Sequence, residues 1–199
     1  SGQATCWGRD QYGETSPPGD SFTSLSLTKD SSCGITTNGS IVCWGRTITG
    51  IPSYSDFIQL SMGLYQFGCG LRAGGSIHCF GNGTYNQLSS PSGTFTQISS
   101  GYYHACALSS SGSISCWGHS GTNRLSAPSG TYNYVSAANT YSCALNQNGN
   151  ISCWGENIPT PPNGTFSTIT AQQLHQCGIM TNGFANCWAD TNSYAATIP

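Results

Sequence analysis

Charged side chains are scarce in this sequence. Asp, Glu, Lys and Arg together make up 6% of its 199 residues, against about 25% in an ordinary soluble domain. With five Lys plus Arg and a formal net charge of −2, there is no basic surface for nucleic acid or for an anionic membrane. No apolar run approaches the roughly 18 residues of a membrane helix, so we expect no insertion into a membrane.

Cysteine, by contrast, is abundant and regularly spaced. Ten of the eleven cysteines form five pairs, and the members of each pair are ten positions apart. The pairs are Cys33 and Cys43, Cys69 and Cys79, Cys106 and Cys116, Cys143 and Cys153, and Cys177 and Cys187. Structural zinc sites use Cys-x2–4-Cys spacing, so the longer spacing favours disulfides in an oxidising, extracellular compartment.

The stretch from Cys106 to Gly118 is typical of a β-hairpin. Apolar and polar residues alternate on both sides of a Ser-Gly turn, which is the strand pattern. Folding the stretch about Ser111 sets Cys106 opposite Cys116, and opposed antiparallel residues lie about 4.5–5.5 Å apart. That separation suits a disulfide. A large apolar residue, Trp117, follows the second cysteine.

This hairpin pattern occurs five times at intervals of about 37 residues, so the chain is a repeat protein. Each unit is too small to bury its own faces and must stack on its neighbours. The expected units form a single repeat domain over 1–199: a half repeat with its connector at 1–20, then repeats at 21–53, 54–90, 91–127, 128–161 and 162–199. No segment has a helical period, so we expect an all-β protein. Short strands stacked radially make a β-propeller, and a β-solenoid is the alternative. In the second unit Phe57 lies one residue further from its cysteine, which indicates a bulge or a longer loop.

At this point the pattern resembles a known family. Residues 101–108, Gly-Tyr-Tyr-His-Ala-Cys-Ala-Leu, and 112–118, Gly-Ser-Ile-Ser-Cys-Trp-Gly, resemble the RCC1-type propeller repeat, which runs Gly-x-x-His-x-x-x-Leu and then Gly-x-Val-x-x-Trp-Gly. The paired cysteines are closest to its secreted version, as in the ectodomain of Crinkly-type plant receptor kinases. The resemblance implies an RCC1-like β-propeller of five full repeats plus an N-terminal half repeat, with one disulfide per repeat. The usual ring has six or seven blades, and the family's functions are diverse.

The sequence offers little for catalysis. His104 and His175 occupy the histidine position of the repeat, but other units have Ser31, Phe67 and Tyr141 there, so we interpret this position as structural. His78 and His119 have no acidic neighbour in the sequence, and no nucleophile–base order or phosphate loop stands out. We therefore expect no catalytic, metal or cofactor site, and no enzyme.

Aromatic residues fall into two groups. The aromatic that follows each second cysteine is expected in the core, because neighbouring units cover both faces of a blade; stacking on sugars is the alternative. The tyrosines of the connectors are better surface candidates, since loops carry function. They are Tyr12, Tyr54, Tyr85 and Tyr194.

N-glycosylation sequons occur at four asparagines. Asn38 lies in a predicted hairpin turn, and Asn82 and Asn163 lie in connectors, so we expect glycan on these three. Asn150 starts a predicted strand and is a weaker candidate.

These observations predict a secreted, non-catalytic propeller that associates with itself as the structural subunit of an extracellular fibre or coat. The alternative is a lectin or receptor ectodomain module that binds glycans or peptides; an inhibitor or exchange factor has no support in the residues. Residues 4–8, Ala-Thr-Cys-Trp-Gly, are predicted to form a strand without a partner in its own unit. We expect residues 1–8 to pair with another subunit or with the fifth unit, and Cys6 to be unpaired or joined to a second chain.

Overall fold

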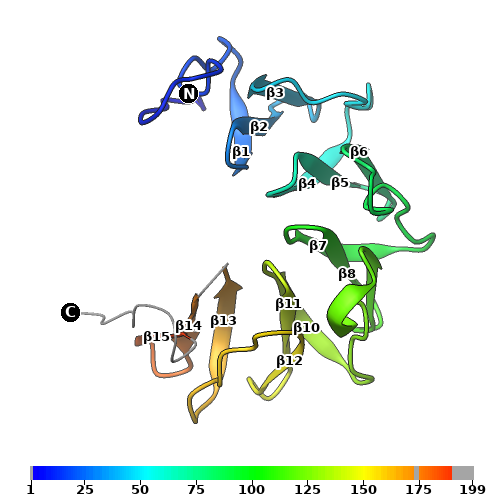
Figure 1. The fold of residues 1–199 in the computed structure, drawn as a ribbon, viewed down its shortest axis with the longest axis vertical. Helices are drawn as coiled ribbons and strands as arrows, with labels where there is room; N and C mark the ends of the chain where they lie inside the picture. Colours follow the sequence, from blue (N-terminus) through cyan, green and yellow to red (C-terminus); the bar gives the residue numbers. More distant parts are fainter. Residues whose placement is uncertain (1, 173–174, 190–199) are drawn as a thin grey trace.

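The computed structural model describes residues 2–172 and 175–189. This part of the chain forms five three-stranded antiparallel sheets, which we call blades 1 to 5 in chain order. The strands are β1 (Phe22–Leu27), β2 (Ser31–Thr36), β3 (Ile41–Gly45), β4 (Phe57–Gly63), β5 (Phe67–Arg72), β6 (Ile77–Gly81), β7 (Phe95–Ser100), β8 (His104–Ser109), β9 (Ile114–Gly118), β10 (Tyr132–Ala137), β11 (Tyr141–Asn146), β12 (Ile151–Gly155), β13 (Phe166–Ala171), β14 (His175–Met180) and β15 (Ala185–Ala189). The blades stand around a common centre as an arc that covers more than half of a circle and is open between blades 1 and 5 (Figure 1). One 3-10 turn, Gly121–Asn123, lies in the connector after β9.

Each blade carries a disulfide between its second and third strands. In blade 3, Cys106 lies directly opposite Cys116 in the register of β8 and β9, with the two Cα atoms 4.0 Å apart. The same bond recurs as Cys33–Cys43, Cys69–Cys79, Cys143–Cys153 and Cys177–Cys187. The expectation of one disulfide per repeat is thus confirmed. At the turn, Gly112 has φ +83°, and a Cβ there would lie 2.6 Å from the Thr131 side chain, so glycine is required at this position.

Neighbouring blades are joined by apolar packing. Tyr141, Cys143 and Leu145 of blade 4 form one buried cluster with Phe166, Ile169 and Trp188 of blade 5. The aromatics that follow the second cysteines are buried in every blade, namely Trp44, Phe80, Trp117, Trp154 and Trp188. Their predicted place in the core is confirmed. Three of the indole groups also donate to carbonyls of the connectors: Trp44 Nε1 to Glu14 at 3.0 Å, Trp117 Nε1 to Gln87 at 2.8 Å and Trp154 Nε1 to Arg124 at 2.9 Å.

In blades 1 to 4, a serine near the end of the first strand, which lines the centre of the arc, adds a hydrogen bond to the next blade. Ser99 Oγ of blade 3 accepts a bond from the Ala137 amide of blade 4 at 2.9 Å. The equivalent bonds join Ser26 to Met62, Ser61 to Ser100, and Ser136 to Ala171. All four interfaces between blades therefore use one contact at one register position.

Two local expectations need refinement. The pairing of the first and second strands shifts register near the first residue in every blade, so a bulge is common to all five units. The extra residue of the second unit lies instead in the turn after β4. Met62 pairs with Gly68 across five intervening residues, whereas the equivalent pair in blade 3, Ser100 and Ala105, has four residues between its members.

The predicted strand over residues 4–8 does not form. Only Gln3 makes a bridge, with Ser21, and residues 4–8 have no strand conformation. A strand needs a neighbour to satisfy its backbone groups, and residues 2–3 lie along the start of β1 without continuing as a ladder. Consequently Trp7 is 87% exposed, and Cys6 is a half-buried free thiol.

Candidate binding surfaces

Among the described residues, His104 is the titratable group whose pKa departs most from its ordinary value. It is fully buried between blades 3 and 4, and its Nε2 lies 2.8 Å from Ser142 Oγ. Burial, and to a lesser extent the charges of Arg124 and His119, lower its pKa to about 3. The imidazole is therefore neutral at physiological pH, and it works as a hydrogen-bonding core residue, which agrees with a structural role.

The other histidines are dispersed. His175 is exposed at the start of β14. His78 packs edge-on against Tyr54 and His119 against Tyr85, with ring centroids 5.4 Å and 4.9 Å apart. Within residues 2–172 and 175–189, no three His, Cys, Asp or Glu side chains are close enough to hold a metal ion. In the same part of the chain, no helix has the length and hydropathy to cross a membrane.

A cluster of tyrosines marks one face of the arc. This face carries the turns between the first and second strands of the blades, and we call it the tyrosine face. Tyr65, from the turn of blade 2, lies 4.7 Å from Tyr103 and stacks on Tyr102 at 5.8 Å. Tyr85 lies 4.9 Å from Tyr103 and extends the cluster toward His119. All five rings are half-buried, so their edges and faces remain available to a ligand.

A polar hollow of about 290 Å³ adjoins this cluster, beside the turns of blades 1 and 2. Its lining combines charged, amide and aromatic side chains from three blades and the connectors. They include Lys29, Asp30, Arg46, Tyr65, Gln66, Asn82 and Tyr102. A second hollow, of about 330 Å³, lies along the centre of the arc and is lined by the inner strands and the adjoining turns. It is formed mainly by the serine, glutamine and aliphatic side chains that join the blades.

The two ends of the arc expose apolar residues that are buried elsewhere in the repeat. On blade 5, Ile179 is 40% exposed, whereas its equivalent in blade 4, Leu145, is 1% exposed. An apolar groove of about 170 Å³ runs over this face, beside the Cys177 sulfur. On blade 1, Leu25 and Leu27 are 46% and 60% exposed. These are the faces that a neighbouring blade covers in the interior of the arc.

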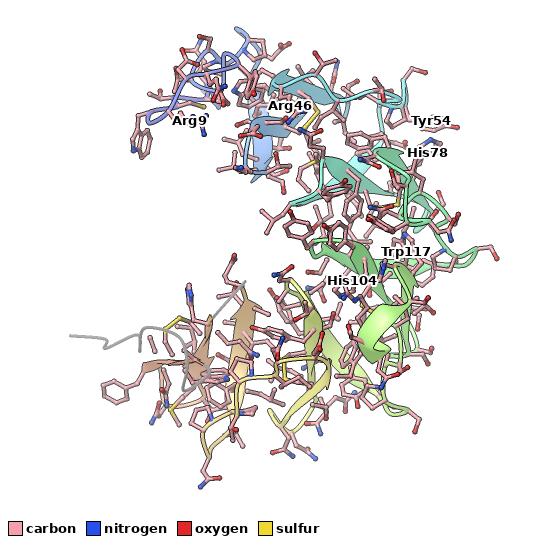
Figure 2. All side chains as sticks on the ribbon, in the orientation of Figure 1. Arg9, Arg46, Tyr54, His78, His104 and Trp117 are labelled. Carbon is pink, nitrogen blue, oxygen red and sulfur yellow. A yellow bond between two sulfur atoms is a disulfide. The ribbon has the colours of Figure 1, made fainter. Side chains whose placement is uncertain are left out.

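The structure places the other predicted site residues at separate positions. Asn38 and Asn163 are exposed and Asn82 is half-buried at the polar hollow. Asn150 is also exposed, in the turn before β12, so its position does not set it apart. Of the connector tyrosines, Tyr12 and Tyr54 lie near Arg46 and Arg72, Tyr85 joins the tyrosine cluster, and Tyr194 lies outside the described residues. Figure 2 shows Arg9 and Arg46 in different parts of blade 1 and its N-terminal extension, and Tyr54 beside His78.

Sequence reasoning missed Tyr65, Tyr102, Tyr103 and the hollow beside them. Tyr102 and Tyr103 stand at variable positions of the repeat motif. Arg46 directly follows a strand, and nothing in the sequence around it indicates a role. The extra residue of the second unit was the one feature of the sequence that pointed to this site, because the lengthened turn carries Tyr65 and Gln66.

Comparisons with known proteins agree with this architecture. The sequence profile of the regulator of chromosome condensation (RCC1) repeat matches residues 95–123. No curated protein matches the sequence significantly. The ectodomain of the Physcomitrella patens receptor kinase CR4 is similar over 100% of this chain and 59% of its own length, with 27% identity and a TM-score of 0.82. The chain therefore spans about three fifths of that ectodomain.

Two further solved structures support the fold alone. The Crinkly WD40 ectodomain of the Arabidopsis thaliana receptor kinase ACR4 matches 87% of this chain and 70% of its own length, at 23% identity and a TM-score of 0.73. Prp20p from Saccharomyces cerevisiae matches 86% of this chain and 58% of its own, at 19% identity and a TM-score of 0.71. The chain thus has an RCC1-like β-propeller fold with five disulfides, and it is similar to Crinkly-like receptor ectodomains. Its disulfides and these neighbours point to an extracellular location.

Proposed function

We propose that this protein is a secreted, non-catalytic structural subunit that joins further copies of itself in an extracellular fibre or coat. The observation that carries the proposal is the chemical match between the two end blades of the arc that the described residues form. The end of blade 5 offers the groups with which each blade holds the next one, and the end of blade 1 offers the groups that receive them.

The match follows from register positions in the interior of the arc. The residue two before the first cysteine of one blade meets the residue one before the first cysteine of the next blade. Phe67 and Ala105 share a buried cluster in this way, and His104 bonds to Ser142 at 2.8 Å. At the two ends, the corresponding residues are His175 on blade 5, which is exposed, and Ser32 on blade 1, which is 7% exposed. A contact between two copies would therefore repeat the histidine–serine pair.

The inner strands match in the same manner. A serine hydroxyl of one blade accepts a bond from a backbone amide of the next at four interfaces. Thr170 of blade 5 holds the serine position with an exposed hydroxyl side chain, and Leu27 of blade 1 holds the amide position. The apolar groove beside Ile179 would receive Leu25 and Leu27 of the second copy.

The shape of the arc determines how such contacts could propagate. The five blades already occupy more than half of a circle (Figure 1), so two arcs cannot fit into one closed ring. A head-to-tail contact that does not close generates a helical filament. Successive copies would consequently rise along the axis of the arc. The low content of charged residues, 6%, leaves little repulsion between copies.

The N-terminal extension can strengthen the same contact. Trp7 is 87% exposed and Cys6 is a free thiol beside it, so residues 2–8 present both an apolar anchor and a group able to cross-link. We propose that this extension reaches the neighbouring copy.

The proposal is tested by the native mass of the purified chain and by two matched variants. Leu27 and Ile58 are exposed to nearly the same extent, 60% and 61%, but only Leu27 lies at an end of the arc. Leu27→Glu should convert assemblies to single subunits, whereas Ile58→Glu should leave them unchanged, as measured by light scattering after size exclusion and by electron microscopy. A wild-type chain that stays monomeric at tens of micromolar would overturn the proposal.

A second candidate function is a ligand-binding module of a receptor ectodomain. The similarity to the CR4 ectodomain at 27% identity and the half-buried tyrosine cluster favour it. A monomer that binds an extracellular glycan or peptide would support this candidate instead of the fibre subunit.

A further inference from the structure

The polar hollow beside the tyrosine cluster has the chemistry of a binding site. Its lining offers an ammonium group from Lys29, a guanidinium from Arg46, a carboxylate from Asp30, and amides from Gln66 and Asn82. A small number of polar groups that converge beside aromatic rings is typical of ligand pockets. Two of the chain's five Lys and Arg residues face this one hollow, so it is locally cationic on a protein of net negative charge.

The lengthened turn of blade 2 builds one wall of the hollow. Its extra residue lets Leu64, Tyr65 and Gln66 project from the tyrosine face, and Gln66 adopts a left-handed conformation with φ 53°. A non-glycine residue in this region is unfavourable, and such residues cluster at functional sites. The Leu64 amide donates to the Gly101 carbonyl at 3.2 Å, which holds the turn against blade 3.

Arg46 is fixed in place before any ligand arrives. With the Gln66 amide oriented to satisfy its neighbours, its Oε1 accepts hydrogen bonds from Arg46 Nε at 2.8 Å and from Arg46 Nη1 at 2.9 Å. The Asp30 carboxylate lies 3.6 Å from the same guanidinium, whose side chain is still 50% exposed. A preorganised, accessible guanidinium is suited to a planar carboxylate.

The aromatic rings continue the site beyond the hollow. Tyr102 lines the hollow and stacks on Tyr65, with an interplanar angle of 30°. The cluster then extends through Tyr103 and Tyr85, whose rings are inclined to one another by 70°, so an aromatic surface with phenolic hydroxyls leads away from the cationic end. Rings with an apolar body and a polar edge suit sugar units, which have apolar faces and hydroxyl rims.

We infer that this hollow and the adjoining tyrosine cluster bind a carboxylated saccharide. The sugar carboxylate contacts Arg46 and Lys29, its hydroxyls bond to Asp30, Gln66 and Asn82, and the next sugar ring lies over Tyr102. This site is independent of the ends of the arc, so it goes beyond the structural role proposed above.

Asn82 links this site to glycosylation. Its Oδ1 accepts bonds from the Thr84 amide at 2.9 Å and from the Thr84 hydroxyl at 2.6 Å, and the side chain lines the hollow. A glycan on Asn82 would fill the space that an external saccharide needs. Binding and modification at Asn82 therefore exclude each other.

The experiment is a calorimetric titration of the full chain, made without glycan in an oxidising bacterial periplasm. A galacturonic acid hexamer is the probe, and an uncharged glucose hexamer is its matched control. We expect binding of the acidic probe only. Lys29→Gln removes an exposed charge and Arg46→Gln removes the fixed one; each should weaken binding about tenfold or more. Arg9→Gln, an equal loss of charge outside the hollow, should leave binding unchanged.

Three results would overturn the inference: no binding of the acidic hexamer, equal binding of both hexamers, or an equal effect of Arg9→Gln and Lys29→Gln. Thermal unfolding confirms that each variant is folded. Protein carrying a glycan on Asn82 should not bind, and retained affinity would place the saccharide elsewhere. The native mass of the same samples reports on self-association separately, so failure of either proposal is recognised without the other.

Discussion

His104 Nε2 lies 2.8 Å from Ser142 Oγ across the interface of blades 3 and 4. His175 and Ser32 hold the same two register positions at the opposite ends of the arc. One pair of residue types thus serves as a buried contact inside the molecule, and the same two types stand at its ends, where His175 is exposed and Ser32 is 7% exposed. The difference in environment is large, because His104 is 0% exposed and His175 is exposed.

The burial of His104 predicts a loss of stability in acid. Its pKa is about 3 in the folded protein, against about 6.5 in an unfolded chain. Between these values the unfolded state binds a proton that the folded state does not, so the free energy of unfolding falls as pH decreases from 6.5 toward 3, by about 1 kcal/mol per pH unit. In the His104→Gln variant, the free energy of unfolding should fall less between pH 7 and pH 4.5 than in the wild-type protein. Urea unfolding at the two pH values measures this difference. His78→Gln is the control, and an equal pH response of all three proteins would contradict the prediction.

The tryptophans predict a pair of unequal substitutions. Trp117→Phe removes a buried hydrogen bond of 2.8 Å to the Gln87 carbonyl, which should cost about 1–3 kcal/mol in addition to lost packing. Trp188→Phe should cost less, because Trp188 Nε1 has no hydrogen-bond partner among the described residues. Phe80 shows that phenylalanine fits the position. Urea unfolding of the two variants measures the difference, and equal losses would refute the assignment.

Each disulfide should make a limited contribution. The bond between Cys106 and Cys116 closes a loop with a sequence separation of 10, which is worth at most about 2.7 kcal/mol in the chain-entropy model. The double variant Cys106→Ala/Cys116→Ala should unfold at lower urea concentration by up to that amount, whereas Cys6→Ser should leave stability unchanged. Non-reducing peptide mapping that links cysteines of different blades would contradict the pairing.

Glycosylation is predicted at Asn38, Asn82 and Asn163 when the chain passes through a eukaryotic secretory pathway. Asn38 and Asn163 are exposed and Asn82 is half-buried, so we expect the first two to be occupied more fully. Peptide mass spectrometry after enzymatic deglycosylation measures occupancy at each asparagine. An intact mass equal to that of the bare 20.8 kDa chain would reject this prediction.

The repeat itself could be predicted from the sequence because its contacts are local. Cys106 and Cys116 meet within one hairpin, and the turn glycine and the following Trp117 lie in the same 13-residue stretch. Five copies of this pattern also indicate which faces of the hairpins must be buried. The burial of the core aromatics and the propeller architecture could therefore be predicted. The strand expected at residues 4–8 failed because a strand depends on a neighbour, and local pattern carries no information about one.

The remaining features were decided only when the blades assembled. Arg46, Gln66 and Tyr102 are far apart in the chain and come together because three blades bring their turns to one face. The match between Leu27 and Thr170 likewise exists only at the ends of a curved arc. Alternation and spacing along the chain determined each hairpin, because its partners are neighbours in sequence. The hollow, the tyrosine face and the complementary ends were decided by the tertiary structure, because they depend on the angle and register at which one blade packs on the next.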